Sequence, residues 1–133
     1  MAVVFTLADD FLVATWRQYD FMLQGLRAVE SDLRKLQIPF YLLQGDPPAI
    51  LHQFTVQYGV DTVVSDFDPL RIKQSWKERF MQKSPAKFLE VDAHNIVPCR
   101  QASQKTEYGA YTLRPKIHRL LETYLDEFPV PAP

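Results

Sequence analysis

The sequence predicts a three-layer α/β/α fold with a short parallel sheet of about four strands. Four short apolar, β-branched runs alternate with longer segments whose apolar residues recur at helical spacing. This alternation implies right-handed crossovers between parallel strands. The chain has 133 residues, of which 47% are hydrophobic and 23% charged, as expected for one globular domain.

The first strand–helix unit opens near the start of the chain. Val3–Leu7 is a continuous apolar run, typical of a strand covered on both faces. A long amphipathic helix follows and ends before Pro39. Its apolar stripe comprises Trp16, Tyr19, Leu23, Leu26, Leu33 and Leu36. Trp16, like Trp76 on a later helix, is expected in the core.

Residues 40–43 predict a second buried strand, and 62–65 a third. Between them, Asp46 and Pro47 fit the N-cap and first turn of a helix that ends at Gly59. Asp68 and Pro69 repeat this start ahead of a helix running to about residue 83. Residues 88–91 complete the strands.

After the fourth strand the alternation of strand and helix patterns stops. Residues 92–110 are polar and show neither helical nor strand periodicity, which predicts an ordered loop or a docking segment. Arg114 and Pro115 open a final helix. We therefore expect one domain over residues 1–128, followed by a proline-rich linker over 129–133.

Composition excludes several classes of function. The net charge of −1 attracts neither nucleic acid nor an anionic membrane. One cysteine allows no internal disulfide, and three scattered histidines have no zinc spacing, so we expect a cytoplasmic protein without a bound metal. Cys99 is expected to be buried and inert. The isolated glycines match neither a dinucleotide fingerprint nor a Walker loop.

Polar residues follow the predicted strands, where ligands of parallel sheets collect. The candidates for ligand binding are Asp9, Asp10, Asp66, Asp68, Arg71, Asp92 and His94. Helix capping explains Asp46 and Asp68 without a ligand. The basic face of the third helix, from Arg71 to Lys87, is interpreted as solvated surface in preference to a nucleic-acid site.

Several stretches together resemble the class II cyclobutane pyrimidine dimer photolyases. They are residues 91–99 (VDAHNIVPC), 102–105 (ASQK), 107–108 (EY), 112–116 (TLRPK), 65–71 (SDFDPLR) and 17–22 (RQYDFM). Arg100 departs from the family pattern, which has an aromatic residue there. The likeness covers nearly the whole chain.

The resemblance implies a modified Rossmann-like N-terminal domain, which in many photolyases holds an antenna chromophore of the deazaflavin or folate type. It assigns FAD, lesion binding and electron transfer to a helical domain outside this chain, so the chain alone should bind no FAD and repair no DNA. Residues 92–111 are expected to dock onto that helical domain. The candidates for this contact are Asn95, Gln104, Lys105, Tyr108 and Arg114.

The family domain opens with another strand and helix ahead of the strand matched by Val3–Leu7. That strand lies between those matched by Val3–Leu7 and 62–65. We expect these two strands to pair directly, giving the order second, first, third, fourth. Self-association through the incomplete sheet is the alternative.

Two other functions remain open at this point. A cryptochrome-type photoreceptor would share this domain but signal instead of repairing DNA. A freestanding α/β module would bind a nucleotide or a protein partner.

Overall fold

The computed structural model describes residues 1–127, and within them the predicted strands all form. Their bounds are β1 Val3–Leu7, β2 Phe40–Gln44, β3 Thr62–Asp66 and β4 Lys87–Val91. Each begins and ends within one residue of the position predicted from the sequence. β1 pairs with β2, and β3 with β4, both in parallel. The predicted linker, 129–133, lies outside the described residues.

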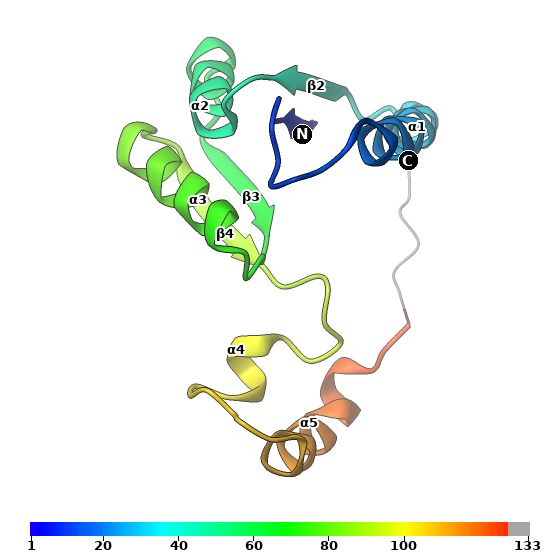
Figure 1. The fold of residues 1–133 in the computed structure, drawn as a ribbon, viewed down its shortest axis with the longest axis vertical. Helices are drawn as coiled ribbons and strands as arrows, with labels where there is room; N and C mark the ends of the chain where they lie inside the picture. Colours follow the sequence, from blue (N-terminus) through cyan, green and yellow to red (C-terminus); the bar gives the residue numbers. More distant parts are fainter. Residues whose placement is uncertain (128–133) are drawn as a thin grey trace.

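Helices alternate with these strands, as Figure 1 shows. Their bounds are α1 Trp16–Lys35, α2 Pro47–Tyr58, α3 Arg71–Lys83, α4 Cys99–Ala102 and α5 Ala110–Tyr124. The order β1-α1-β2-α2-β3-α3-β4, followed by α4 and α5, confirms the predicted α/β class. Gly59 ends α2 in the left-handed conformation, with φ 61°, as the sequence predicts.

Three helix predictions need correction. Asp68 does not cap α3: its carboxylate accepts the N–H of Leu70 at 2.9 Å, and Leu70 itself is the N-cap residue. α5 begins at Ala110 and therefore carries Pro115 inside it, at the cost of one backbone hydrogen bond. α4, a single turn, was not predicted, because four residues are too few to show a period.

The expected direct closure of the sheet is wrong. The described strands form two separate pairs, β1–β2 and β3–β4, and β1 does not hydrogen bond to β3. A cavity lies between them, with Thr6 on one side and Ser65 on the other. Pro47, Pro48 and Leu51 of α2 line the same cavity.

The buried core is small and lies mainly between α2, α3 and β4. Phe80 of α3 is 1% exposed, and its ring lies 5.8 Å from that of Phe88 in β4. Thr55 and Ser84, both buried, join α2 to the end of α3 through hydroxyls 3.3 Å apart. These contacts connect the two pairs of strands.

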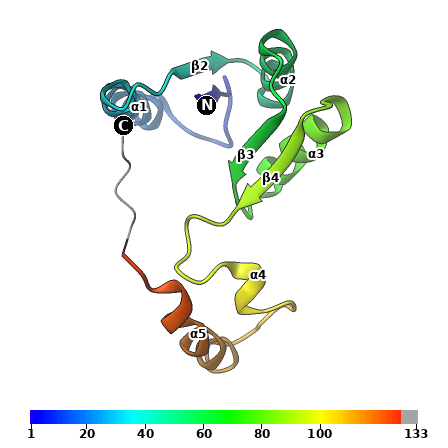
Figure 2. The ribbon, with the colours of Figure 1, turned by 180° about the vertical axis from the view of Figure 1, so that it is seen from behind.

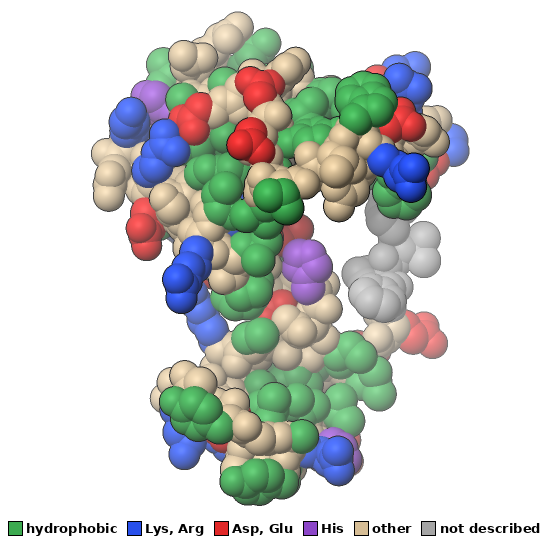
Figure 3. All heavy atoms as spheres, viewed as in Figure 1, with side chains coloured by type: hydrophobic (Ala, Val, Ile, Leu, Met, Phe, Trp, Pro, Cys, Tyr) green, Lys and Arg blue, Asp and Glu red, His purple; other side chains and the backbone are tan. Residues whose placement is uncertain are grey.

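Several burial predictions are wrong. Trp16 is 76% exposed, because it is the first residue of α1 and lies beyond the part of the helix that packs on the strands. Leu42 of β2 is 45% exposed and Val64 of β3 62%, so neither of these strands is covered on both faces. Apolar side chains accordingly reach the surface at several places in Figure 3.

α4 and α5 form a unit of their own, set apart from the strands and the first three helices in Figures 1 and 2. A polar cluster holds this unit together. The ammonium of Lys116 in α5 donates to the carboxylate of Glu107 and, at 3.1 Å, to the hydroxyl of Ser103. Ser103 also donates to Glu107 at 2.8 Å.

The glycines of α1 and α2 should respond oppositely to alanine. Gly59→Ala forces a Cβ into the left-handed conformation and should lower the free energy of unfolding by about 1–2 kcal/mol. Gly25→Ala in α1, where a Cβ meets nothing within 4 Å, should raise it by about 0.5–1 kcal/mol. Urea denaturation measures both, and equal effects would contradict the assigned conformations.

Candidate functional site

The carboxylates at the ends of the first two strands are engaged with neighbouring side chains. Asp9 accepts a hydrogen bond from the amide of Gln44 at 2.7 Å, which joins the ends of β1 and β2. Asp46 precedes α2 but makes no side-chain cap there. Its two oxygens instead accept from the guanidinium of Arg79 in α3, at 2.8 and 3.2 Å.

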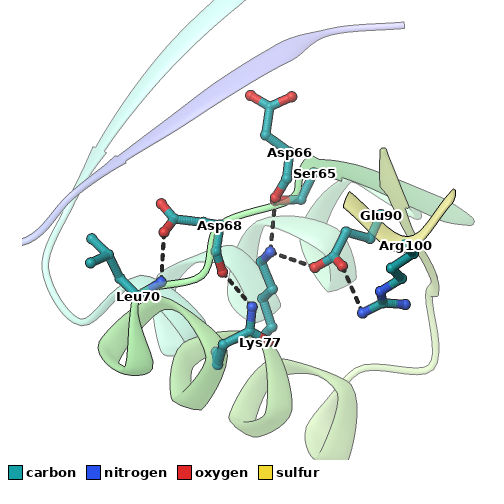
Figure 4. A network of polar contacts seen from close by, with 8 residues as sticks. Ser65, Asp66, Asp68, Leu70, Lys77, Glu90 and Arg100 are labelled. Atoms are coloured by element: carbon teal, nitrogen blue, oxygen red, sulfur yellow. Dashed lines mark hydrogen bonds and ion pairs between the residues drawn. The ribbon is translucent and has the colours of Figure 1, made fainter. Parts of the chain in front are cut away.

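A polar network occupies the ends of β3 and β4 (Figure 4). Lys77 of α3 donates to the carbonyl of Asp66 at 2.8 Å and to the carboxylate of Glu90 at 2.5 Å. The other oxygen of Glu90 accepts from Arg100 of α4 at 3.1 Å. The Lys77 and Glu90 side chains are only 11% and 17% exposed, so this pair is shielded from water.

Glu90 therefore links three elements: its own strand, α3 and α4. The Arg100 side chain is 80% exposed, which leaves its ion pair weak by itself. Lys77 is the stronger partner because it is the more buried. Arg100, the departure from the family pattern, thus contributes a contact between α4 and the sheet.

Asp92 and Asn95 shape the turn that leads from β4 into α4. The backbone N–H of Cys99 donates to the Asp92 carboxylate at 2.8 Å, and the Asn95 amide donates to it at 2.9 and 3.1 Å. The Cys99 N–H, with further help from Asn95, lowers the pKa of Asp92 below its ordinary value. Asp92 thus has a structural role in this turn.

Cys99 is exposed, so its predicted burial is wrong. α4 is a short surface turn that does not place the side chain in a core. Partial desolvation of the thiol, together with its contact to Asp92, still raises the pKa of Cys99. Because the thiolate is the nucleophile, this environment disfavours nucleophilic chemistry at Cys99.

An aromatic hollow of about 290 Å³ lies beside β1, between α1, α3 and the segment that joins β1 to α1. The rings of Phe11 and Trp76 are 5.9 Å apart, and the ammonium of Lys73 lies 5.2 Å from each of them. Sequence reasoning missed this grouping. Phe11 falls outside every periodic segment of the sequence. Lys73 was interpreted only as one of several cations on the solvated face of the third helix.

The structure disperses the residues predicted to bind a ligand. Asp9 and Asp10 follow β1, Asp66, Asp68 and Arg71 lie between β3 and α3, and Asp92 and His94 follow β4. None of them lines the two hollows beside β1. Their role in ligand binding stays a prediction. Over residues 1–127, no three His, Cys, Asp or Glu side chains are grouped so as to hold a metal ion.

Contacts within the protein engage several charges on the basic face of α3. Lys77 binds Glu90, Arg79 binds Asp46, and Lys73 lies over two aromatic rings. Fewer free cations therefore remain for phosphate contacts than the sequence suggested. This arrangement agrees with the interpretation of α3 as ordinary surface.

The predicted docking residues lie on or near the α4–α5 unit, and most are exposed. Tyr108 is 96% exposed, and Gln104, Lys105, Asn95 and Arg114 also reach the surface. Arg114 lines a shallow apolar groove on α5 with Leu113, Ile117 and His118. These features are compatible with a docking surface, which stays a prediction.

Comparison with known proteins decides the family. Residues 1–132 match the family model described as DNA photolyase. The chain belongs to the DNA photolyase family. It is 49% identical over 129 residues to a deoxyribodipyrimidine photo-lyase of Potorous tridactylus and 47% identical over 131 residues to one of Arabidopsis thaliana. A third, from Methanothermobacter thermautotrophicus, is 35% identical over 127 residues.

These matches cover 94–97% of the chain but only 24–28% of the three photolyases. The chain thus spans about a quarter of the length of its relatives. The predicted likeness to the N-terminal region of a photolyase is confirmed. None of the helices that the structure describes is long and apolar enough to cross a membrane.

Loss of the Glu90 charge should destabilise the photolyase chain. Glu90→Gln leaves the shielded Lys77 ammonium without its anion and should lower the free energy of unfolding by about 1–3 kcal/mol. The control is Glu78→Gln, on an exposed position of α3, which should change it by less than about 0.5 kcal/mol. Equal losses in urea denaturation would show that the Glu90 network contributes nothing specific.

Glu107 should titrate far below an ordinary glutamate. The Lys116 ammonium, followed by the Thr112 and Ser103 hydroxyls, lowers its pKa from 4.5 to about 2. A lowered folded-state pKa stabilises the fold above the unfolded value, and this contribution is lost as the pH falls from about 4.5 to 2. NMR of the Glu107 carboxyl carbon should show the low midpoint, and Lys116→Met should move it up towards 4.5. An unchanged midpoint in Lys116→Met would refute the assigned cause.

Proposed function

We propose that this chain is the N-terminal scaffold and antenna-type domain of a class II deoxyribodipyrimidine photolyase, whose complete form uses light to repair cyclobutane pyrimidine dimers in DNA. The observation that carries this proposal is the match to the photolyase family over residues 1–132, at about a quarter of the relatives' length. The printed names of the three relatives favour repair over photoreceptor signalling.

The chain alone is proposed to be non-catalytic. FAD, damaged DNA and electron transfer belong, by the family resemblance, to a helical domain elsewhere in the complete protein. One observation supports this division: Asp9, Asp46, Glu90 and Asp92 are all engaged by neighbouring groups.

An antenna chromophore of the deazaflavin or folate type does not fit the described residues as they stand. The candidate residues are spread over three strand ends, and neither hollow beside β1 is lined by any of them. The aromatic hollow instead runs along the unpaired edge of β1. We therefore propose scaffolding as the role of this chain.

The proposed partner of the α4–α5 unit is the helical FAD domain. Its contact surface would include Tyr108 and Tyr111, which are 96% and 83% exposed, and the groove beside Arg114. Large exposed aromatic side chains are typical of the centre of a protein interface.

The purified chain should show no photoreactivation and no stoichiometric FAD. Thymine-dimer repair under near-UV and blue light, with a complete photolyase as positive control, tests the first expectation, and the flavin absorbance of the purified chain tests the second. Repair by the chain alone would overturn the proposal that catalysis belongs to the helical domain. An absorbance band beyond that of tryptophan, without flavin, would establish antenna binding in place of scaffolding alone.

A further inference from the structure

The strand pair β3–β4 presents an apolar face to solvent. The ring of Phe88 packs against Phe80 of α3, so the side chains that alternate with Phe88 along β4 point away from α3. Leu89 and Val91 are among them, and the register places Val64 of β3 beside Leu89. Val64, Leu89 and Val91 are 62%, 40% and 50% exposed. We call the side of β3–β4 that carries these three residues the open face.

Two opposite charges lie at the ends of the open face. Asp66 is the last residue of β3, two after Val64, and Lys87 is the first residue of β4, two before Leu89. Both side chains are exposed and point to the side of Val64 and Leu89. Figure 4 shows the Asp66 carboxylate directed away from Lys77 and α3. Lys77 binds the backbone carbonyl of Asp66, which leaves the carboxylate available to a partner.

α5 carries a stripe of side chains with the matching arrangement. The stripe follows the spacing of one side of a helix and consists of Arg114, Ile117, His118, Leu121 and Glu122. Its first three residues line the shallow groove on α5. Ile117 and Leu121 make the middle apolar, a cation stands at one end and an anion at the other.

The contact of α5 with the rest of its unit does not use this stripe. Lys116, which binds Glu107, lies two residues from both Arg114 and His118 and therefore on the opposite side of the helix. Arg114, His118 and Glu122 are exposed. The stripe is thus free to meet another surface.

The charges of the stripe and of the open face match in spacing. Asp66 is level with Val91, four residues beyond Lys87, which gives about 13 Å along the strands. Arg114 and Glu122 are eight residues apart, or about 12 Å along a helix. A helix laid antiparallel to the strands would bring Arg114 to Asp66 and Glu122 to Lys87 at once. The parallel direction would oppose like charges.

The chain's own α5 is held elsewhere. Arg100 of α4 binds Glu90, whose side chain lies on the α3 side of the sheet because it also binds Lys77. α5 is in turn joined to α4 by the Lys116–Glu107 pair. To place its own α5 on the open face, the chain would have to break at least one of these contacts. The α5 of a second copy can reach the open face with all of them intact.

We propose that this chain self-associates, with α5 of each copy covering the open face of the other. Ile117 and Leu121 pack against the apolar centre of the face, and the two ion pairs set the direction of the helix. In a two-fold dimer the contact is made twice. The proposal does not rest on the photolyase function. In a complete photolyase, where the groove beside Arg114 is proposed to meet the helical domain, the two partners would exclude each other.

Charge reversal tests the contact. Sedimentation equilibrium of the purified chain, from micromolar to millimolar concentration, measures the dimer. Asp66→Arg sets a cation against Arg114 and should weaken the dimer at least about tenfold, because the reversed contact occurs twice. Arg114→Asp should have the same effect. The double variant Asp66→Arg/Arg114→Asp recreates the ion pair in reverse and should restore the affinity to within about threefold of the unmodified chain.

Matched controls reverse the same charges elsewhere on the surface. Glu78→Arg on α3 and Arg17→Asp on α1, both at exposed positions, should leave the dimer unchanged, and urea denaturation checks that every variant folds. A chain that stays monomeric at all concentrations would overturn the proposal. So would equal weakening by the controls, or a double variant that fails to recover. Association through the strand edges would be indifferent to Arg114→Asp, and that result would also reject the proposed contact.

Discussion

The contact between α2 and α3 is what makes one body out of two separately paired halves. The described strands form backbone hydrogen bonds only within the pairs β1–β2 and β3–β4, so no ladder of hydrogen bonds joins one pair to the other. Phe80 of α3, almost fully buried, and the Thr55–Ser84 hydroxyl contact carry the connection. Because so few side chains are fully buried, stability depends on this junction more than in a domain with a continuous sheet.

The polar network around Glu90 extends the same body towards the C-terminal helices. Lys77 anchors Glu90 from α3, and Arg100 attaches α4 to the same carboxylate. Asp92 then fixes the turn into α4 through the Cys99 N–H. The α4–α5 unit is held together by its own ion pair, between Glu107 and Lys116. It also carries exposed aromatic residues.

The local structure was more predictable from the sequence than its assembly. Apolar runs and proline or glycine signals located all four strands, and Gly59 marked the end of α2, because these features depend on neighbouring residues. The gap between β1 and β3 was not predictable, since no local pattern reveals whether two edges meet. The predicted burial of Trp16 and Cys99 was wrong for the same reason, because burial depends on which other segment packs against that position.

The candidate site shows the same division between local and long-range information. The sequence located Asp9 and Asp46 at the strand ends, yet their partners came from elsewhere in the chain: Gln44 for Asp9 and Arg79 for Asp46. Glu90, which the sequence did not single out, pairs with Lys77 of α3. Two cations of the basic face of α3, Arg79 and Lys77, are used for the contacts with Asp46 and Glu90. Asp46 and Glu90, which are already paired with cations, gain little by binding a metal, because each carboxylate would first have to lose its present partner.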